Sequence, residues 1–391
     1  MTPLEAERFC RTHLFCPKTH LFYEHLVDLE KDGASRHLPS PALIRAGIPC
    51  GTGWSTGMED SVLCGSRMLD AYLARFQKTG SDDDAAFAKE IWQGLRLCAS
   101  VSDEPGFIAR SVSPADGVSH YPDSSRDQYT HFVFSASAYY DSPLATEDDK
   151  AFIRKTFAAV ADRMARTVTP ENDYQFPRED GAAGIVFKMW GQIGKHEYDR
   201  LPMMYLAAAR YTGEAKYEAL YRQCVAEALE KSKGYDYAHA AAAYPAMQMQ
   251  YALLYLYEHD DDPTVRAACR ALMEKAAAAY RKRAYMWFDE LSAPAVKETL
   301  NVRFKPWYEE PAIFGGVFGG YAYYNHNAFG ARMPFWRKAT DVADAAVTVC
   351  LVYGQDKALA DLVDEALALF DANDHYSNAP LYLFHAHTLL S

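Results

Sequence analysis

Residues 245–257 read PAMQMQYALLYLY, with no Asp, Glu, Lys or Arg, and residues 263–285 follow after a short polar link as PTVRAACRALMEKAAAAYRKRAY. A helix that is apolar on all sides is typical of a buried position. The second segment carries a single apolar stripe, with charges on its other face, which is typical of a helix at the surface. This pair of unlike helices sets the pattern for the whole chain.

The same two kinds of segment alternate six times from end to end. Those with one apolar stripe are residues 3–31, for which a break at Pro17 is the alternative, 83–100, 147–168, 215–233, 263–285 and 356–372. Those of the apolar kind are residues 58–79, 125–141, 199–212, 243–258, 336–353 and 380–390, of which 58–79 is less cleanly apolar because it contains Arg67, Asp70 and Arg75. The alternation predicts an all-α fold, an (α/α)6 toroid in which six outer helices surround six inner ones.

The connections between these helices support the toroid. Links from inner to outer helices are short, as expected for adjacent antiparallel helices, whereas many links in the other direction are long: 32–57, 101–124, 169–198 and 286–335. We therefore predict one domain over residues 1–391, with its long loops at one end, above the N-termini of the inner helices. Short strands are expected at Gly106–Val112 and Val296–Phe304.

Composition excludes several classes of partner. The 40 basic and 52 acidic residues give a net charge of −12, so attraction to a nucleic-acid backbone is not expected. No apolar run is long enough for a membrane span, the first residues have no signal-like apolar region, and the eight cysteines form no CxxC pair. These features predict a cytoplasmic protein with reduced thiols, and they leave a homo-oligomer open.

Aromatic residues make up 14% of the chain, and the tryptophans gather in the long links. Trp54, Trp190, Trp287 and Trp307 fall there, and Trp336 opens an inner helix. Flat aromatic faces suit the C–H face of a sugar ring, and ligand pockets combine such surfaces with a few polar groups. Packing of the loops against the barrel would place them there as well.

Polar side chains occur at the start of each inner helix, where a toroid would aim them at one common volume. Asp60 and Asp127 open successive inner helices, and a pair of carboxylates can serve as the acid and the base of sugar hydrolysis. Arg126, Arg200 and Arg337 can each bind a carboxylate of the substrate. The sequence thus predicts a small, anionic oligosaccharide as the substrate.

With these two aspartates so placed, the chain resembles the unsaturated glucuronyl hydrolases and unsaturated rhamnogalacturonyl hydrolases, and more widely the helical-toroid glucuronidases. The resemblance implies a glycoside hydrolase that acts on uronic-acid-containing oligosaccharides from the non-reducing end. It further implies that Asp127 is the general acid and base and Asp60 its partner.

Two other functions stay open. A helical-toroid lyase would use Tyr and His for proton transfer, and a non-catalytic toroid would bind carbohydrate through its aromatic residues alone. The expected catalytic residues are Asp60, Asp127, His131 and His196. The expected substrate-binding residues are Trp54, Arg126, Gln128, Tyr129, Tyr198, Arg200, His239, Trp307, Trp336 and Arg337. His196-Glu197 lacks the second histidine of HExxH, so neither a metal nor a cofactor is expected.

Overall fold

The structure, a computed structural model, describes the chain except for residues 55, 186–187, 302, 304–311, 319–320 and 327–333. Of residues 312–318, 321–326 and 334, it describes the backbone only. Trp307 therefore lies outside the described residues.

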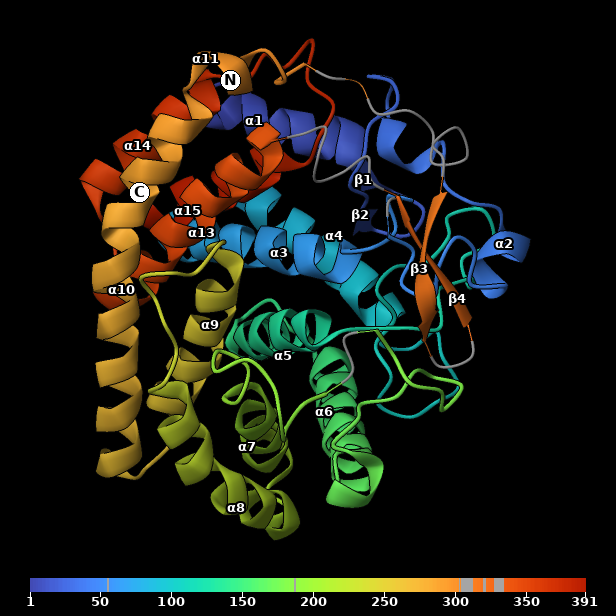
Figure 1. The fold of residues 1–391 in the computed structure, drawn as a ribbon, viewed down its shortest axis with the longest axis vertical. Coiled ribbons are helices and arrows are strands. Elements are labelled where there is room, and N and C mark those ends of the chain that lie inside the picture. The colour runs from blue at the N-terminus through green and yellow to red at the C-terminus, as the bar shows by residue number, and fades with distance from the viewer. Residues whose placement is uncertain (55, 186–187, 302, 304–311, 319–320, 327–333) are drawn as a thin grey trace.

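Six helices form a closed inner ring (Figure 1). They are α3 (Ser61–Thr79), α5 (Arg126–Asp141), α7 (Arg200–Thr212), α9 (Tyr244–His259), α13 (Pro334–Tyr353) and α15 (Ala379–Leu390). Each contacts the next along the chain, and α15 contacts α3, which closes the ring. The side chains of these helices are mostly buried, in agreement with their apolar sequences.

Six further helices pack around the ring. They are α1 (Pro3–Phe9), α4 (Asp82–Cys98), α6 (Glu147–Thr167), α8 (Ala215–Ser232), α10 (Pro263–Leu291) and α14 (Lys357–Ala368). Each contacts one or two inner helices: α4 packs on α3, α8 on α7, and α10 on both α9 and α13. The predicted all-α toroid is confirmed by these contacts.

Local signals explain where several of these helices begin and end. Thr2 and Thr146 each form a capping box, as their sequences predict. Gly80, Gly213 and Gly354 follow inner helices with φ of 68°, 72° and 75°, the left-handed conformation that glycine adopts at a helix end without strain. The links from inner to outer helices are consequently short.

The first outer helix is much shorter than predicted. A helix over 3–31 was expected, with a break at Pro17 as the alternative; α1 passes into one π-helical turn, Cys10–Leu14, and ends there, three residues before Pro17. Strand β1 (Phe15–Cys16) pairs antiparallel with β2 (Leu21–Phe22), and Pro17 opens the turn between them. Phe15 and Phe22 pack against Phe87 of α4, so tertiary packing overrides the helical periodicity here.

Among the described residues of the two predicted ranges, which leave out 302 and 304, no strand is present. Gly106–Val112 is irregular, and the start of Val296–Phe304 belongs to the short helix α11 (Pro294–Lys297). The link after α10 instead contains an antiparallel pair, β3 (Ala312–Phe318) and β4 (Tyr321–His326), which lies across the molecule from α10 in Figure 1. The remaining short elements are α2 (Pro41–Arg45) and the 3₁₀ turns Gly33–Ser35 and Pro170–Asn172.

Helix α3 belongs fully to the inner ring, although three charges made its sequence less clear. Arg67 and Asp70 are buried inside the barrel and 0% and 9% exposed; Arg67 pairs with Asp344, whereas Asp70 accepts one long hydrogen bond from the Tyr251 hydroxyl. Trp287 also differs from expectation, since α10 extends to Leu291 and buries that ring on an outer helix. All eight cysteines are free thiols. In the part of the chain that is described, no helix is long and apolar enough to cross a membrane.

Candidate active site

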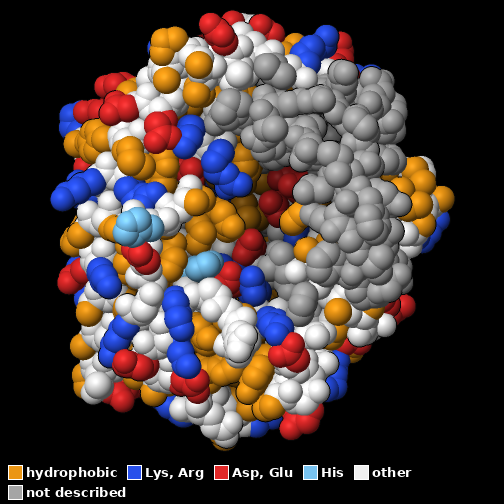
Figure 2. Space-filling model, in the orientation of Figure 1, with side chains coloured by type: hydrophobic (Ala, Val, Ile, Leu, Met, Phe, Trp, Pro, Cys, Tyr) orange, Lys and Arg blue, Asp and Glu red, His pale blue; other side chains and the backbone are white. Residues whose placement is uncertain are grey.

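A cavity of about 370 Å³ lies at the end of the barrel where the inner helices begin. Five of those helices contribute lining residues from their first turns or from the residues just before them. Near the start of the sixth helix, α7, the lining residue is Glu197, which lies three positions before the helix begins. Of the predicted site residues, the cavity is lined by Trp54, Asp60, Arg126, Asp127, Trp336 and Arg337. Figure 2 shows a hollow near the centre of one face of the molecule, where acidic and basic side chains meet.

Asp60 is held from two sides. Its Oδ1 atom accepts hydrogen bonds from Arg110 Nη2 at 2.7 Å and from Gln128 Nε2 at 2.6 Å. Gln128 is itself fixed, because its Oε1 accepts from the backbone N–H of Leu63 in the first turn of α3. Burial raises the pKa of Asp60; the Arg110 charge opposes that rise, and the nearby charge of Asp127 adds to it. Asp60 therefore keeps its proton to a higher pH than an exposed aspartate does.

Asp127 has a different environment. Its Oδ1 atom lies 2.6 Å from Arg200 Nη1, and the second terminal nitrogen of Arg200 donates to Gln248 Oε1 at 2.6 Å. The Arg200 side chain is only 1% exposed, whereas that of Asp127 is 28% exposed and reaches the cavity. An anchored guanidinium thus stabilises a carboxylate that remains open to a ligand.

Most of the arginines at the cavity already have a carboxylate partner. Arg67 pairs with Asp344, Arg110 with Asp60, and Arg126 with Glu197. Burial raises the pKa of Glu197, but the charge of Arg200, the hydrogen bond from His196 and the charge of Arg126 lower it to about 2, so this carboxylate stays charged.

Arg337 is different, since within the described residues no carboxylate forms an ion pair with it. Its guanidinium stands 5.4 Å from the ring centre of Tyr244 and 5.0 Å from that of Trp336. The Trp336 ring is held in turn by a hydrogen bond of 2.6 Å from its Nε1 to Asn378 Oδ1. An exposed arginine between two aromatic rings is suited to bind an anionic group of a ligand.

Several predicted residues do not line the cavity. His131 is fully buried beside Tyr251, and burial lowers its pKa far below the usual range. The Tyr129 hydroxyl donates to Gly106 O and accepts from Ile108 N, and the Tyr198 hydroxyl donates to Gly191 O. The two tyrosine hydroxyls therefore hold loops in place.

The last two predicted histidines lie outside the cavity as well. His196 contacts Glu197 at 3.0 Å but is separated from the cavity by it. His239 is 85% exposed and pairs with Asp236 three positions earlier. The fold thus leaves both histidines on the loops rather than at the start of an inner helix.

The structure also adds residues that the sequence patterns did not single out, namely Arg67, Arg110, Gln248, Asp344 and Tyr382. A signal was present for two of them, because Arg67 and Asp344 are charges within segments predicted as inner helices, and a buried charge needs a partner. Arg110 gives no such signal, since it lies in an irregular link whose path the sequence does not define.

No protein-family profile and no curated protein sequence matches this chain. Among solved structures it is similar to the α-1,6-mannanase GH76A of Salegentibacter sp. HEL1_6, with 10% identity and a TM-score of 0.34. A second structure is an inactive variant of that enzyme in complex with α-1,6-mannotriose, with 11% identity and a TM-score of 0.35. Each comparison covers 99% of this chain and 98% of the other. At such low TM-scores the likeness supports no functional conclusion, and the sections below rest on the residues of this chain.

Proposed function

We propose that the protein is a glycoside hydrolase that acts on uronic-acid-containing oligosaccharides from the non-reducing end, with Asp60 and Asp127 as its catalytic carboxylates. The observation that carries this proposal is the pair itself. Two aspartates from neighbouring inner helices open into one cavity, and each is held by its own set of donors. Hydrolysis of a glycosidic bond needs one carboxyl group that donates a proton and one carboxylate that assists water.

The environments favour Asp60 as the acid and Asp127 as the base, the reverse of the roles that the family resemblance implied. The raised pKa of Asp60 favours the protonated group, which would give its proton to the glycosidic oxygen. The Asp127 carboxylate, paired with Arg200, would accept a proton from the attacking water and stabilise positive charge on the sugar.

An acidic sugar fits the charges at the entrance. Arg337 has no ion-pair partner within the described residues, and it lies beside the Trp336 ring, which can cover the apolar face of a sugar. The N-termini of the inner helices meet at this end, and the positive ends of their dipoles also favour an anion. A uronate carboxylate bound at Arg337 would lie in the same cavity that Asp60 and Asp127 line.

The test is an assay of wild-type protein on a panel of unsaturated-uronate, saturated-uronate and neutral oligosaccharides. Ultraviolet absorbance of the conjugated enol ether falls for an unsaturated-uronate hydrolase and rises for a lyase, whereas a saturated glycosidase changes only the reducing sugar. We expect Asp60→Asn and Asp127→Asn each to lower kcat about 10²- to 10⁴-fold. Asp162→Asn, at an exposed aspartate that pairs with Lys216 on the outer surface, is the matched control and should retain activity.

A separate variant tests the acidic sugar. Replacing Arg337 by Met should reduce kcat/KM about 10- to 100-fold on a uronate substrate, because a hydrogen bond to a charged group contributes about 1.5–3 kcal/mol. The methyl ester of the same substrate should be affected much less. Equal losses on both substrates would exclude recognition of the carboxylate by Arg337. Full turnover by both aspartate variants, or binding of sugar without turnover by wild-type protein, would reject the hydrolase.

A further inference from the structure

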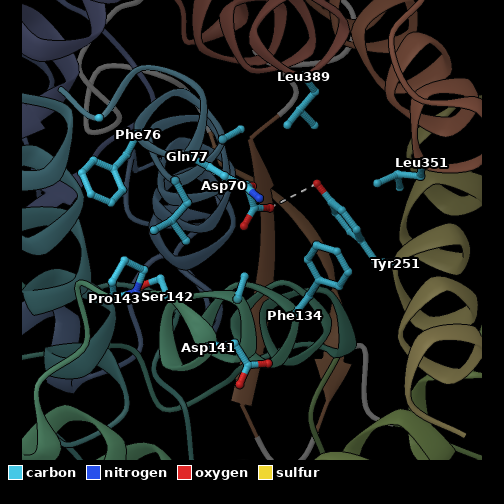
Figure 3. A pocket seen from close by; sticks show the side chains of 14 residues that line it. Asp70, Phe76, Gln77, Phe134, Asp141, Ser142, Pro143, Tyr251, Leu351 and Leu389 are labelled. Carbon is cyan, nitrogen blue, oxygen red and sulfur yellow. Dashed lines mark hydrogen bonds between the residues drawn. The ribbon is translucent and has the colours of Figure 1, made fainter.

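A second cavity lies at the opposite end of the barrel, where the inner helices finish. Its volume is about 680 Å³, and its lining comes from the C-terminal halves of α3, α5, α13 and α15 together with Tyr251 of α9 (Figure 3). On α3, Arg67 lines the catalytic cavity and Asp70, one turn further on, lines the second. The two cavities therefore occupy the same barrel axis, separated by a layer of buried side chains.

The walls of the second cavity are apolar. Leu73, Phe76, Leu351 and Leu389 line it, and Phe134 completes the wall with its ring centre 4.2 Å from that of Tyr251. Figure 3 shows Phe76, Phe134, Leu351 and Leu389 around the space. Such a surface suits an apolar or aromatic body and provides few groups for the hydroxyls of a sugar.

One carboxylate stands within this apolar wall. Asp70 is 9% exposed, and its Oδ2 accepts only a long hydrogen bond of 3.4 Å from the Tyr251 hydroxyl. For Oδ1, no hydrogen-bond partner lies within the described part of the chain, and the nearby Ser135 hydroxyl donates to Ser66 O. Burial raises the pKa of Asp70 to about 7, although Ser135, Arg67 and Tyr251 lower it, and a bound cation would stabilise the charged carboxylate.

The backbone favours a cation at this end as well. Gly80 and Ser142, which follow the last residues of α3 and α5, line the cavity, and α13 and α15 end beside it. The C-terminal end of a helix carries partial negative charge on its unpaired carbonyl groups. Asp141 at the rim adds a further negative charge, although it is shared with Arg210 at 2.9 Å.

We propose that this second cavity binds a small organic ammonium compound, with its apolar body against Phe134 and Leu351 and its charged nitrogen at Asp70. The aromatic rings of Phe134 and Tyr251 add cation–π attraction to the same nitrogen. This site is separate from the catalytic cavity and does not depend on the proposed hydrolase activity.

The experiment compares three probes of similar size and different charge on wild-type protein by isothermal titration calorimetry at pH 8, where Asp70 is mostly ionised. The probes are benzylamine, which is protonated at this pH, benzyl alcohol and benzoate. We expect benzylamine to bind at least tenfold more tightly than benzyl alcohol, and benzoate more weakly still. Equal affinities for benzylamine and benzyl alcohol would overturn the proposal, because the apolar walls alone would then account for binding.

Variants locate the site. Asp70→Asn should weaken benzylamine at least tenfold and leave benzyl alcohol within about twofold of wild type. Asp141→Asn is the matched control at the rim, where Arg210 already neutralises the charge, and it should change little. Ala138→Trp fills the cavity from an exposed position and leaves Asp70 intact, so it tests the site even if Asp70→Asn fails to fold. Unchanged benzylamine binding by Ala138→Trp, or loss of binding only in Asp127→Asn, would place the amine elsewhere and reject the site.

Discussion

The buried ion pair between Arg67 and Asp344 makes a strong prediction about stability. Arg67 Nη1 lies 2.7 Å from Asp344 Oδ1, and the two side chains are 0% and 1% exposed. Within the described residues, Arg67 Nε and Nη2 have no hydrogen-bond partner, although the guanidinium stands 4.3 Å from the ring centre of Tyr382. Asp344 therefore provides most of the compensation for this buried positive charge.

Replacing Asp344 by Ala leaves the guanidinium buried without its carboxylate. Removal of one partner from a buried ion pair costs about 3–5 kcal/mol, and the arginine cannot lose its proton to avoid the cost. We expect Asp344→Ala to lower the free energy of unfolding by about 4 kcal/mol. A loss of this size is a large fraction of the stability of a typical domain, about 5–15 kcal/mol.

The double variant Arg67→Met, Asp344→Leu separates the charge effect from the packing effect. Both charges disappear while volume is retained, and apolar replacement of a whole buried ion pair is often neutral or stabilising. The double variant should therefore lie within about 1 kcal/mol of wild type, so that the two substitutions together cost far less than Asp344→Ala alone.

Urea denaturation followed by tryptophan fluorescence and circular dichroism measures these differences. Asp162→Ala removes a carboxylate from the half-exposed pair with Lys216 and should cost less than about 1 kcal/mol. If Asp344→Ala also costs less than 1 kcal/mol, or if the double variant is no more stable than Asp344→Ala, the buried pair does not have the energetic role described here.

Three further predictions concern protonation and packing. Burial raises the pKa of Asp199 from 3.8 to about 7, so as the pH rises the unfolded chain ionises first and wild-type stability falls between pH 4 and 7. Asp199→Asn should therefore be more stable than wild type by up to about 4 kcal/mol at pH 8 and by little at pH 4. A gain in urea midpoint that does not vary with pH would contradict this prediction. If Asp60 is the acid, its loss of a proton causes the fall of kcat/KM at high pH. This fall should move to higher pH in Gln128→Met, because the hydrogen bond from the Gln128 amide lowers the pKa of Asp60. A fall at unchanged pH would assign it to another group. Gly94→Ala should lower the melting temperature by several degrees, because a Cβ there would lie 2.1 Å from His20 O. Gly65→Ala, where the Cβ would lie 3.1 Å from a movable Leu95 methyl group, should lower the melting temperature less. Equal melting temperatures of the two variants would show that the contact with His20 O is not destabilising.

The helical framework could be predicted from the sequence because it depends on periodicity and charge. A segment such as Pro245–Tyr257, without any charged residue, is stable only when surrounded, and that requirement alone places it inside a ring. Residues 15–22 could not be predicted in the same way. Their apolar residues fit a helical stripe, but Phe15 and Phe22 contact Phe87, which lies far along the chain, and these contacts stabilise a hairpin instead of a helix.

The candidate site also includes residues that could be predicted from the sequence and residues that could not. Asp60 and Asp127 could be placed because each opens an inner helix, and a helix start has a fixed direction in a toroid. His131 belongs to one of the same helices but lies one turn beyond Asp127, deep enough to be buried below the cavity. Depth along the helix, which the residue types do not reveal, therefore decides which polar groups reach a substrate.

A common direction of the inner helices links the two cavities. Since the first turns of α3, α5 and α13 line one cavity and their last turns line the other, the helix dipoles add instead of cancelling, with positive ends at the candidate active site and negative ends at the second cavity. The side chains strengthen this difference, because Arg337, which forms no ion pair with a described carboxylate, lies at one end, and Asp70, which accepts one long hydrogen bond, lies at the other. A ligand that carries both an anionic and a cationic group would therefore be favoured at neither end, and the two sites should select for opposite charges.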